Sequence, residues 1–581
     1  MNVSEQLLQI LINAGVRQVF GVTGDALNHF VDAIRRQKVL EWVTVRHEET
    51  GSYAAYAQGR LSGNIGVCAG TVGPGALHLI NGLYNAKKER SPVIAITGQV
   101  AAVERGTNYF QEVDLENAFS DVCAYQAIIR TPEEAPRVIL RAIKIALAQG
   151  AVCRIELPAD VAAMDAGGER FMHQVPRSDA LLVPGQGSLE AAAQCLHSGK
   201  LITILAGDGC REAHADVLEL SRKLKAPIVH TFRASDVFDH DTPGVVGLTG
   251  LIGCPSGFHA IMKADRLLML GTDFPYEAFL PHGTRTVQVD TRLENIGNRT
   301  AVEVGVHGDV QVAVRQLLPM VEEVKDDSFL CSMQAAFNKW KVHMRSDANY
   351  ENDHEPLHPQ LFARAINEGA SDDAIFTIET GTSAIWAARY ISFHHERRAL
   401  GSFNHGSMGV GLPSAIGAQS LYPEREVWAM VGDGSFTMGM QDMLTAVERK
   451  LPIKIIVFNN KELGFVKLEM EEAGLVPQYD ALHQFNPDFA AYAKLCGGDG
   501  VRVEHAKDVA AAIEQAKRSK VPFIIDAVVS GGELSFPPNI TFKQMLGFGK
   551  SKVKEAALAI SGDAEQWKNL SEEVTTTLDK L

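Results

Sequence analysis

Three polar residues in the C-terminal half of the chain have the types and spacing of a metal and phosphate site. Asp433 stands between two glycines in Gly432-Asp433-Gly434, and Asn459-Asn460 follow after 24 further residues. Carboxylate and amide oxygens are ligands that a hard divalent cation prefers, and Gly434 lets the main chain approach a phosphate closely. A Gly-Asp-Gly run alone is more often an ordinary turn, so the interpretation depends on the paired spacing.

Each of these motifs follows an apolar run typical of a buried strand, at residues 426–431 and 453–458. Residues 441–449 between the runs have helical spacing, which predicts a strand–helix–strand unit. Parallel strands joined in this way end at the same edge of a sheet. We therefore expect the aspartate and an asparagine to meet at that edge and to share one cation.

A second candidate site is the run Arg46-His47-Glu48-Glu49, which follows an expected strand and precedes a helical run. A glutamate at such a place is usually a first-turn residue that matches the helix dipole. The chemical alternative for Glu48 is a carboxyl buried against a heterocycle nitrogen, with its pKa raised by desolvation. Glu49 is the neighbouring candidate for the same role.

Several loops could add contacts to a ligand. Gly73-Pro74-Gly75 and Gly207-Asp208-Gly209 both lack the G-x-G-x-x-G spacing of a dinucleotide loop, which disfavours a nicotinamide dehydrogenase. Residues 109–112 lie in a polar loop, and residues 401–408 precede a glycine-rich helical run. Met408 in the latter loop could equally be ordinary core filler.

The composition is that of a globular protein with several domains. The chain has 581 residues with 46% hydrophobic and 22% charged side chains, which suggests three domains. Its net charge of −15 argues against nucleic-acid binding, and eight scattered cysteines without a C-x-x-C pair favour a reducing cytosol. A secretory signal and an apolar run of about 20 residues are both missing from the sequence. We expect a cytoplasmic protein that at most attaches to a membrane surface.

Apolar strands alternate with helices along most of the chain, which predicts an α/β fold of three doubly wound parallel sheets and a C-terminal tail. We expect domains at residues 1–180, 183–334 and 335–530, and the tail at 531–581. The expected strands are 18–22, 42–45, 65–69 and 93–96, then 201–206, 227–230, 267–271 and 286–290, then 374–378, 426–431, 453–458 and 523–526.

Together these motifs resemble the thiamine-diphosphate- and FAD-dependent pyruvate oxidases, with the closest likeness to their bacterial quinone-reducing branch, the pyruvate:ubiquinone oxidoreductases. The likeness runs from about residue 5 to residue 545 and includes residues 21–25, 46–49, 73–75, 78–82, 109–112 and 401–408. In the middle of the chain, residues 227–230, 248–253, 257–259, 270–276 and 288–290 look like the family's FAD domain. The resemblance makes the three domains pyrimidine-binding, FAD-binding, and diphosphate- and Mg²⁺-binding.

The resemblance also implies a role for individual residues. Glu48 would protonate the aminopyrimidine of thiamine, Met408 would force its V shape, and Phe465 would serve electron transfer. Thiamine diphosphate would contact Gly406, Ser407, Met408, Gly434, Ser435 and Gly464, and Mg²⁺ would bind Asp433, Asn460 and the main-chain carbonyl of Glu462. The substrate would meet Gln111, Phe110, His78, Val466 and Glu469. FAD would contact Gly250, Leu251, Ile252, Gly253, Phe274, Pro275, Tyr276, Glu277, Ala278, Asp290 and Arg292, although the family often has Asn at the last position.

The implied reaction is oxidative decarboxylation of pyruvate to acetate and CO₂ through a hydroxyethyl-thiamine intermediate, with electrons passing through FAD to a quinone. The implied assembly is a homotetramer in which two chains share each active site. The alternatives are a phosphate- and oxygen-dependent oxidase that makes acetyl phosphate, and acetolactate synthase. A non-catalytic scaffold is the remaining alternative, and the presence of Glu48, Asp433 and Asn460 argues against it.

The tail departs from the family pattern. In the quinone-reducing branch a C-terminal segment covers the active site and binds the membrane after reduction. Residues 562–581 have an apolar stripe at near-helical spacing, but their net charge of −3 would be repelled by anionic lipid. Lys543, Lys550, Lys552 and Lys554 precede this stretch. We expect membrane attachment through residues 550–560, and the alternative is a tail that packs on its own tetramer.

Overall fold

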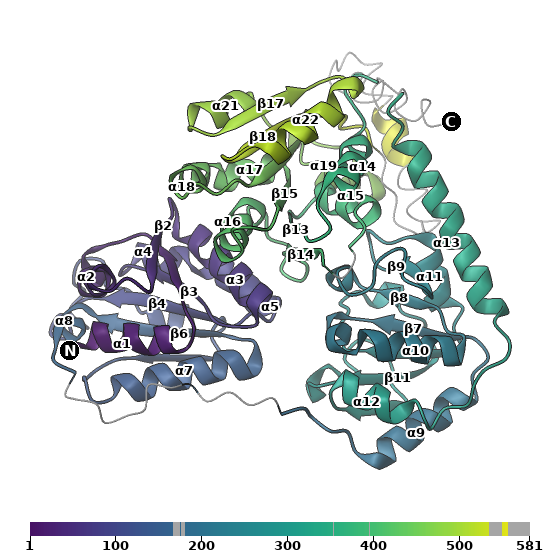
Figure 1. The fold of residues 1–581 in the computed structure, drawn as a ribbon, viewed down its shortest axis with the longest axis horizontal. Helices are drawn as coiled ribbons and strands as arrows, with labels where there is room; N and C mark the ends of the chain where they lie inside the picture. Colours follow the sequence, from purple (N-terminus) through teal and green to yellow (C-terminus); the bar gives the residue numbers. More distant parts are fainter. Residues whose placement is uncertain (167–174, 176–179, 352–353, 394–395, 534–548, 556–581) are drawn as a thin grey trace.

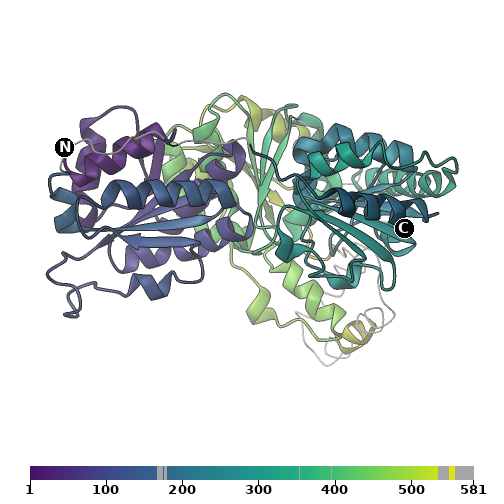
Figure 2. The same cartoon turned by 90° about the horizontal axis from the view of Figure 1, so that it is seen from below.

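Three parallel sheets of six strands form the framework of the molecule in a computed structural model. The model describes the chain except residues 167–174, 176–179, 352–353, 394–395, 534–548 and 556–581. The first sheet domain (purple to blue) and the second (teal) stand side by side, with the third (green) above them in Figure 1 and between them in Figure 2. The predicted fold of three doubly wound α/β domains is confirmed.

The first sheet has the strand order β2-β1-β3-β4-β6-β5. Its strands are β1 Gln18–Gly21, β2 Glu41–Thr44, β3 Gly66–Gly70, β4 Val93–Gln99, β5 Tyr125–Ile128 and β6 Val152–Pro158. The helices are α1 Val3–Asn13, α2 Asn28–Arg36, α3 Glu48–Ser62, α4 Pro74–His78, α5 Ile80–Lys88, α6 Leu115–Ala118, α7 Ala135–Gln149 and α8 Ala159–Ala163.

The third sheet repeats this topology with the order β14-β13-β15-β16-β18-β17. Its strands are β13 Ile375–Ile378, β14 Arg398–Gly401, β15 Val427–Gly432, β16 Lys454–Asn459, β17 Asp499–Val503 and β18 Phe523–Val528. The helices are α14 Pro359–Gly369, α15 Thr382–Tyr390, α16 Gly411–Leu421, α17 Asp433–Gly439, α18 Met443–Glu448, α19 Gly464–Glu472, α20 Tyr479–Leu482, α21 Phe489–Leu495 and α22 Ala506–Arg518.

The second sheet has a different order, β12-β11-β10-β7-β8-β9, in which the direction of winding reverses between β7 and β10. Its strands are β7 Ile202–Ala206, β8 Ile228–His230, β9 Val245–Leu248, β10 Arg266–Leu270, β11 Arg285–Asp290 and β12 Val304–His307. The helices are α9 Gln186–His197, α10 His214–Leu224, α11 Pro255–Met262, α12 Val310–Leu317 and α13 Ser328–Asp347. Helix α13 spans the border that was expected at residue 334. The expected limits of the three domains stay predictions.

The first and third domains share one hydrophobic core. Buried side chains of α3 and of the first sheet belong to the same cluster as those of α16 and of the third sheet. The two helices touch along their backbones, because a Cβ on Gly417 would lie 2.3 Å from the carbonyl oxygen of Ala54. This contact fixes how the residues after α3 and before α16 face one another. Over the described ranges, no helix is both long enough and apolar enough to cross a membrane.

Candidate active site

The metal site predicted from the sequence lies where two neighbouring strands end. Strands β15 and β16 pair in parallel, with Gly432 opposite Phe458, so Asp433 and Asn460 follow adjacent strand ends. The Asp433 carboxylate accepts hydrogen bonds from the main-chain N–H groups of Gly434 (2.8 Å) and Lys461 (2.6 Å) and from the Asn486 amide (2.8 Å). The sheet topology thus brings Asp433 next to the 459–462 segment.

The structure distinguishes between the two asparagines of the motif. The Asn459 amide donates to Asp526 (2.8 Å), and its carbonyl oxygen accepts from Asn486 (3.0 Å), so this side chain is engaged on the sheet side. Asn460 instead turns its Oδ1 to the main-chain N–H of Glu462 at 3.0 Å. Asn460 is therefore the better placed of the two to bind a cation with Asp433.

Burial gives Asp433 the electrostatics of a cation ligand. Burial raises its pKa to about 6, although the hydrogen bonds that it accepts from three N–H groups act to lower the pKa. Holding a negative charge at a site that is 2% exposed costs free energy. A divalent cation on this carboxylate would offset that cost, so the donor set of Asp433, Asn460 and the Glu462 carbonyl fits Mg²⁺.

The beginning of α17 places main-chain N–H groups beside this cation site. Asp433, Gly434 and Ser435 are the first three residues of the helix, whose N–H groups have no carbonyl partner within the helix, and that of Gly434 donates to the Asp433 carboxylate. A Cβ on Gly434 would lie 2.8 Å from Leu463 and 3.8 Å from Met408, and a Cβ on Gly464 would lie 3.0 Å from Asn460. Gly434 therefore lies close to Met408, and Gly464 lies against Asn460, so these residues are neighbours of the cation site.

The loop that carries Gly406, Ser407 and Met408 connects the third domain to the first. The Ser407 hydroxyl lies 2.5 Å from the Tyr53 hydroxyl and accepts from the Asn81 amide at 3.0 Å. Asn81 also donates to Glu49 at 2.7 Å. A cavity of about 520 Å³ lies here, lined by Glu49 from the first domain and by Met408 from the third.

Glu48 contacts His78 and the turn at Gly75 and not the Asn81 and Ser407 side chains. Its Oε2 lies 2.9 Å from His78 Nδ1, and its Oε1 would be 2.9 Å from a Cβ on Gly75. The main chain of Gln111 packs against Gly73 of the same turn, since a Cβ there would meet its carbonyl oxygen at 2.6 Å. The contacts of Glu48 described by the structure therefore all lie in the first domain, as do those of His78 and Gln111.

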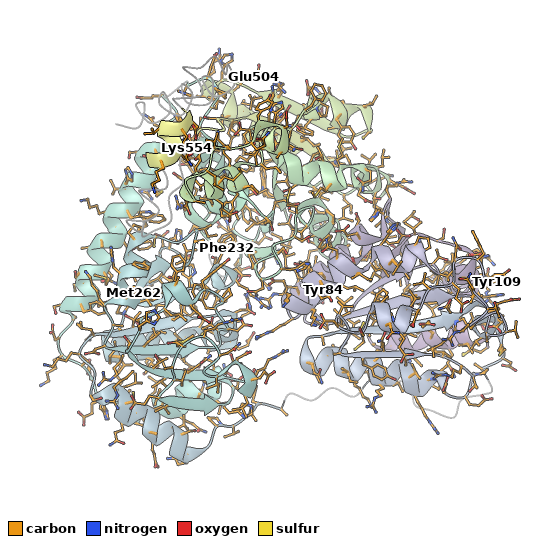
Figure 3. The ribbon with its side chains drawn as sticks, turned by 180° about the vertical axis from the view of Figure 1, so that it is seen from behind. Tyr84, Tyr109, Phe232, Met262, Glu504 and Lys554 are labelled. Atoms are coloured by element: carbon orange, nitrogen blue, oxygen red, sulfur yellow. The ribbon has the colours of Figure 1, made fainter. Side chains whose placement is uncertain are left out.

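Exposed aromatic side chains precede Gln111 in its loop. Phe110 is 78% exposed and Tyr109 is 50% exposed. Tyr109 lies at the outer edge of the first domain in Figure 3, far from the third domain of the same chain. The remaining predicted substrate residues, Val466 and Glu469, lie exposed on α19 of the third domain. One chain thus holds the two groups of predicted residues apart.

A cavity of about 460 Å³ opens where the second sheet reverses its winding. Asp208 and Gly209 follow β7, Gly271 and Thr272 follow β10, and all four line the cavity. The crevice at such a reversal is where open α/β sheets bind nucleotides. Its size and position fit a dinucleotide such as FAD.

Most residues predicted for FAD line this cavity. The lining includes Gly250, Leu251, Ile252, Phe274, Pro275, Tyr276 and Asp290. Four others lie outside it: Gly253 packs under the turn, Glu277 and Ala278 continue into the short helix Glu277–Phe279, and the Arg292 guanidinium donates to the carbonyl of Gln149. Phe465, predicted for electron transfer, also lines the cavity.

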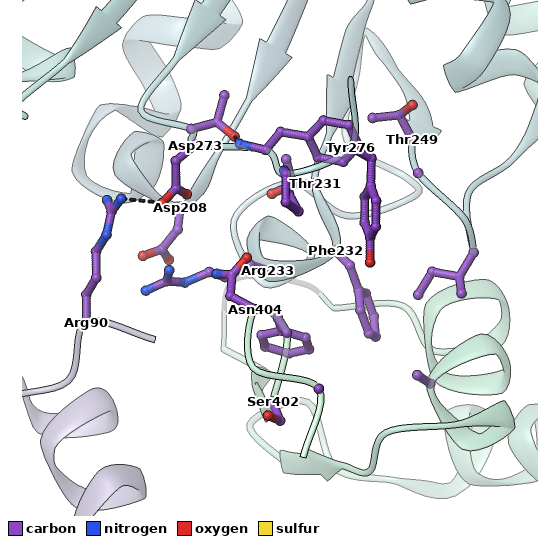
Figure 4. A pocket seen from close by; sticks show the side chains of 18 of the residues that line it. Arg90, Asp208, Thr231, Phe232, Arg233, Thr249, Asp273, Tyr276, Ser402 and Asn404 are labelled. Carbon is purple, nitrogen blue, oxygen red and sulfur yellow. Dashed lines mark hydrogen bonds and ion pairs between the residues drawn. The ribbon is translucent and has the colours of Figure 1, made fainter. Parts of the chain in front are cut away.

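Sequence reasoning missed the charged residues of this cavity. Arg60 and Arg90 come from the first domain and pair with Asp208 and Asp273 of the second, and Figure 4 shows Arg90 reaching in from its own domain. Arg233, Ser402 and Asn404 line another part of the wall. Asp208 stands between Gly207 and Gly209 after a strand, which is the same signal that marked Asp433.

Three domain families of thiamine pyrophosphate enzymes match the chain. Residues 1–118 match the N-terminal TPP binding domain, residues 189–317 the central domain, and residues 379–527 the C-terminal TPP binding domain. A putative thiamine pyrophosphate-containing protein of Bacillus subtilis is 35% identical over 95% of both chains.

Two further relatives have named activities. Pyruvate oxidase of Lactiplantibacillus plantarum is 31% identical over 90% of this chain and 88% of its own. Acetolactate synthase of Mycobacterium bovis is 28% identical over 92% and 89%. With thiamine pyrophosphate domains matched in all three parts of the chain, this protein belongs to the thiamine pyrophosphate enzyme family.

Proposed function

We propose that this enzyme oxidises pyruvate and water to acetate and CO₂ and passes the two electrons and two protons through FAD to a quinone. The observation that carries the proposal is the position of Phe465. This residue lines the 460 Å³ cavity, while the preceding Gly464 packs against Asn460 of the cation site. An electron donor at the cation site and an acceptor in the cavity would then be separated by one side chain.

In the proposed mechanism, Asp433, Asn460 and the Glu462 carbonyl would hold Mg²⁺, and the N–H groups at the start of α17 would bind the diphosphate. Glu48, which is 6% exposed, would hold a proton at a ring nitrogen of thiamine. When bound, thiamine diphosphate supplies the electron sink for decarboxylation, and FAD accepts two electrons. Met408 would support the ring system, which is a positioning effect.

The site is proposed to be complete only between two chains. Within one chain, Glu48 contacts His78, while Met408 faces Glu49 across the 520 Å³ cavity. The exposed Phe110 and Tyr109 of the first domain would be covered by a second chain, which would supply its Asp433 and α19. The substrate pocket would then combine Phe110, Gln111 and His78 of one chain with Val466 and Glu469 of another, in a homotetramer.

A cytoplasmic enzyme that attaches to the membrane surface is the localisation proposed here. Residues 549–555 are helical and bind beside α19: Ser551 donates to the Leu475 carbonyl (2.7 Å), Lys552 to Glu471 (2.9 Å) and Lys554 to the Gly474 carbonyl (2.7 Å). Movement of α19 during turnover would free these lysines for anionic lipid. The predicted apolar stripe at residues 567–581 lies outside the described residues.

The direct test is turnover of pyruvate with a soluble quinone analogue, with and without added thiamine diphosphate and Mg²⁺. We expect acetate formation with stoichiometric quinone reduction, no requirement for phosphate, and bleaching of the flavin absorbance by pyruvate before quinone is added. Acetolactate formed without quinone reduction would support the synthase instead. Acetyl phosphate formed only with phosphate and oxygen would support the oxygen-dependent oxidase.

Removing the Asp433 carboxylate should weaken cofactor binding more than catalysis. We expect Asp433→Ala to raise the Kd for Mg²⁺ and thiamine diphosphate by at least about tenfold, because it deletes the one formal negative charge among the proposed ligands. Excess cofactor should restore part of the activity. The exposed Asp480→Ala serves as control for a lost carboxylate, and a cofactor affinity unchanged in Asp433→Ala would contradict the metal assignment.

Attachment to membranes should depend on pyruvate. We expect full-length holoenzyme to float with anionic liposomes only when pyruvate reduces it, and replacing Lys550, Lys552 and Lys554 together by Gln to abolish the effect. Lys517→Gln on α22 is the matched control. Equal flotation with and without pyruvate would mean that the tail is no redox-gated anchor.

A further inference from the structure

Glu379 is a buried acid that neither the metal site nor the Glu48 cluster uses. It follows β13 directly and is 2% exposed. Its Oε1 accepts from the main-chain N–H of Gly411 at 2.6 Å, and its Oε2 accepts from that of Gly409 at 3.1 Å. The side chain thus bridges the two residues on either side of Val410.

This carboxyl group caps a helix that has no cap of its own. Helix α16 begins at Gly411, and its N-cap residue Val410 has no side chain that could accept a hydrogen bond. A buried helix N-terminus needs acceptors for its main-chain N–H groups. Glu379 supplies them with its two carboxyl oxygens, directly after a strand that ends more than thirty residues earlier in the chain.

Gly409 and Gly411, which donate to Glu379, also form the end of the loop that carries Met408. Gly406 and Gly409 have φ of 70° and 88°, in the left-handed region that glycine adopts readily. The loop backbone is therefore less restricted at these two positions than it would be with other residues. A second tether comes from the residue next to Glu379, since the Thr380 hydroxyl donates to the Ser407 carbonyl at 2.8 Å. Residues 379–380 therefore hold the loop at Ser407, Gly409 and Gly411.

Glu379 lines one ligand space and is hydrogen-bonded to a residue that lines the other. It lines the 460 Å³ cavity, and Gly409, to which it is bonded, lines the 520 Å³ cavity together with Met408. We propose that Glu379 is a positioning residue that fixes the Met408 loop in the shape required for thiamine diphosphate, by holding the N–H groups of Gly409 and Gly411 at the end of β13. The inference deepens the proposed thiamine site, and its test in cofactor-free protein does not depend on the reaction.

The protonation of Glu379 provides a readout that an uncharged packing residue would lack. Burial raises its pKa from 4.5 to about 7, while the N–H groups of Gly411, Gly409, Val410 and Thr380 oppose this rise. The titratable side chain facing it is Tyr53 of α3, whose own pKa is raised by burial and which stays neutral at these pH values. Its neighbours on β15 and α16 are the uncharged Val431 and Gly411.

The sign of the pH effect follows from linkage. The closed loop binds a proton up to about pH 7, whereas an opened loop with a hydrated Glu379 binds it only below 4.5. The closed state is therefore most stable below pH 4.5, and this added stability is lost as the pH rises to about 7. Above pH 7 no further change is expected from this group.

Hydrogen–deuterium exchange of residues 402–412 in cofactor-free protein tests the proposal. After correction for intrinsic exchange, we expect wild-type protection to fall by about tenfold per pH unit between pH 5 and 7 and then to level off. Glu379→Gln should lose this step, because its amide does not titrate, and should bind thiamine diphosphate at least about tenfold more weakly with a nearly unchanged kcat at saturation. Glu424→Gln, an exposed site in the same domain, should behave as wild type.

Two further variants keep the test decisive if Glu379→Gln folds poorly. Thr380→Val removes the tether to Ser407 but keeps the carboxyl group, so it should loosen the loop and retain the pH step. Asp433→Asn removes another buried acid of this domain and should also retain the step. Persistence of the step in Glu379→Gln, or its loss in Asp433→Asn, would overturn the proposal, as would an unchanged cofactor affinity in Glu379→Gln.

Discussion

Buried charges at the junction of the three domains determine how the ligand spaces are arranged. Arg60 of the first domain pairs with Asp208 of the second, and Arg398 of the third pairs with Asp236 of the second at 2.9 Å. Glu89 of the first accepts from the Asn404 N–H of the third at 2.7 Å. Burial alone would raise the pKa of Asp208, yet the guanidinium groups of Arg60, Arg233 and Arg211 hold it well below its ordinary value. A buried charge without its partner costs about 3–5 kcal/mol, so these contacts favour one domain arrangement.

In that arrangement, strands of the second sheet end at the 460 Å³ cavity, and strands of the third sheet end at the cation site. The second sheet has the reversal that suits a dinucleotide, and the third has Asp433 and Glu379 on the two strands at its own reversal, β15 and β13. Because the backbone fixes where parallel strands end, polar residues distant in sequence meet there without long loops. Phe465 lines the cavity, and the preceding Gly464 lies against Asn460 of the cation site, so the two regions are neighbours along the chain.

The sequence predicted what depends on local patterns and missed what depends on tertiary contacts. Apolar runs located twelve strands to within one or two residues at most ends, and the Gly-Asp-Gly and Asn-Asn motifs meet as expected because β15 and β16 are neighbours. Strands β5, β6, β9, β12, β14 and β17 were not anticipated, and all of them except β6 are edge strands. Spacing could not separate Asn459 from Asn460, or Glu48 from Glu49, because adjacent side chains on one backbone differ only in what faces them. Asp208 and Glu379 owe their roles to Arg60 and to α16, which are far away in the sequence.

We propose that two chains complete each active site, with Glu48 from one chain and Asp433 from the other. Subunit mixing of Glu48→Gln with Asp433→Ala tests it most directly, at cofactor concentrations at which each variant alone is inactive. After joint unfolding and reassembly, random pairing would unite an intact Glu48 with an intact Asp433 in about one quarter of the shared sites. We expect the mixture to recover pyruvate oxidation up to about one quarter of the wild-type activity. A mixture that reassembles fully and stays inactive would contradict it, because both residues would then have to come from the same chain.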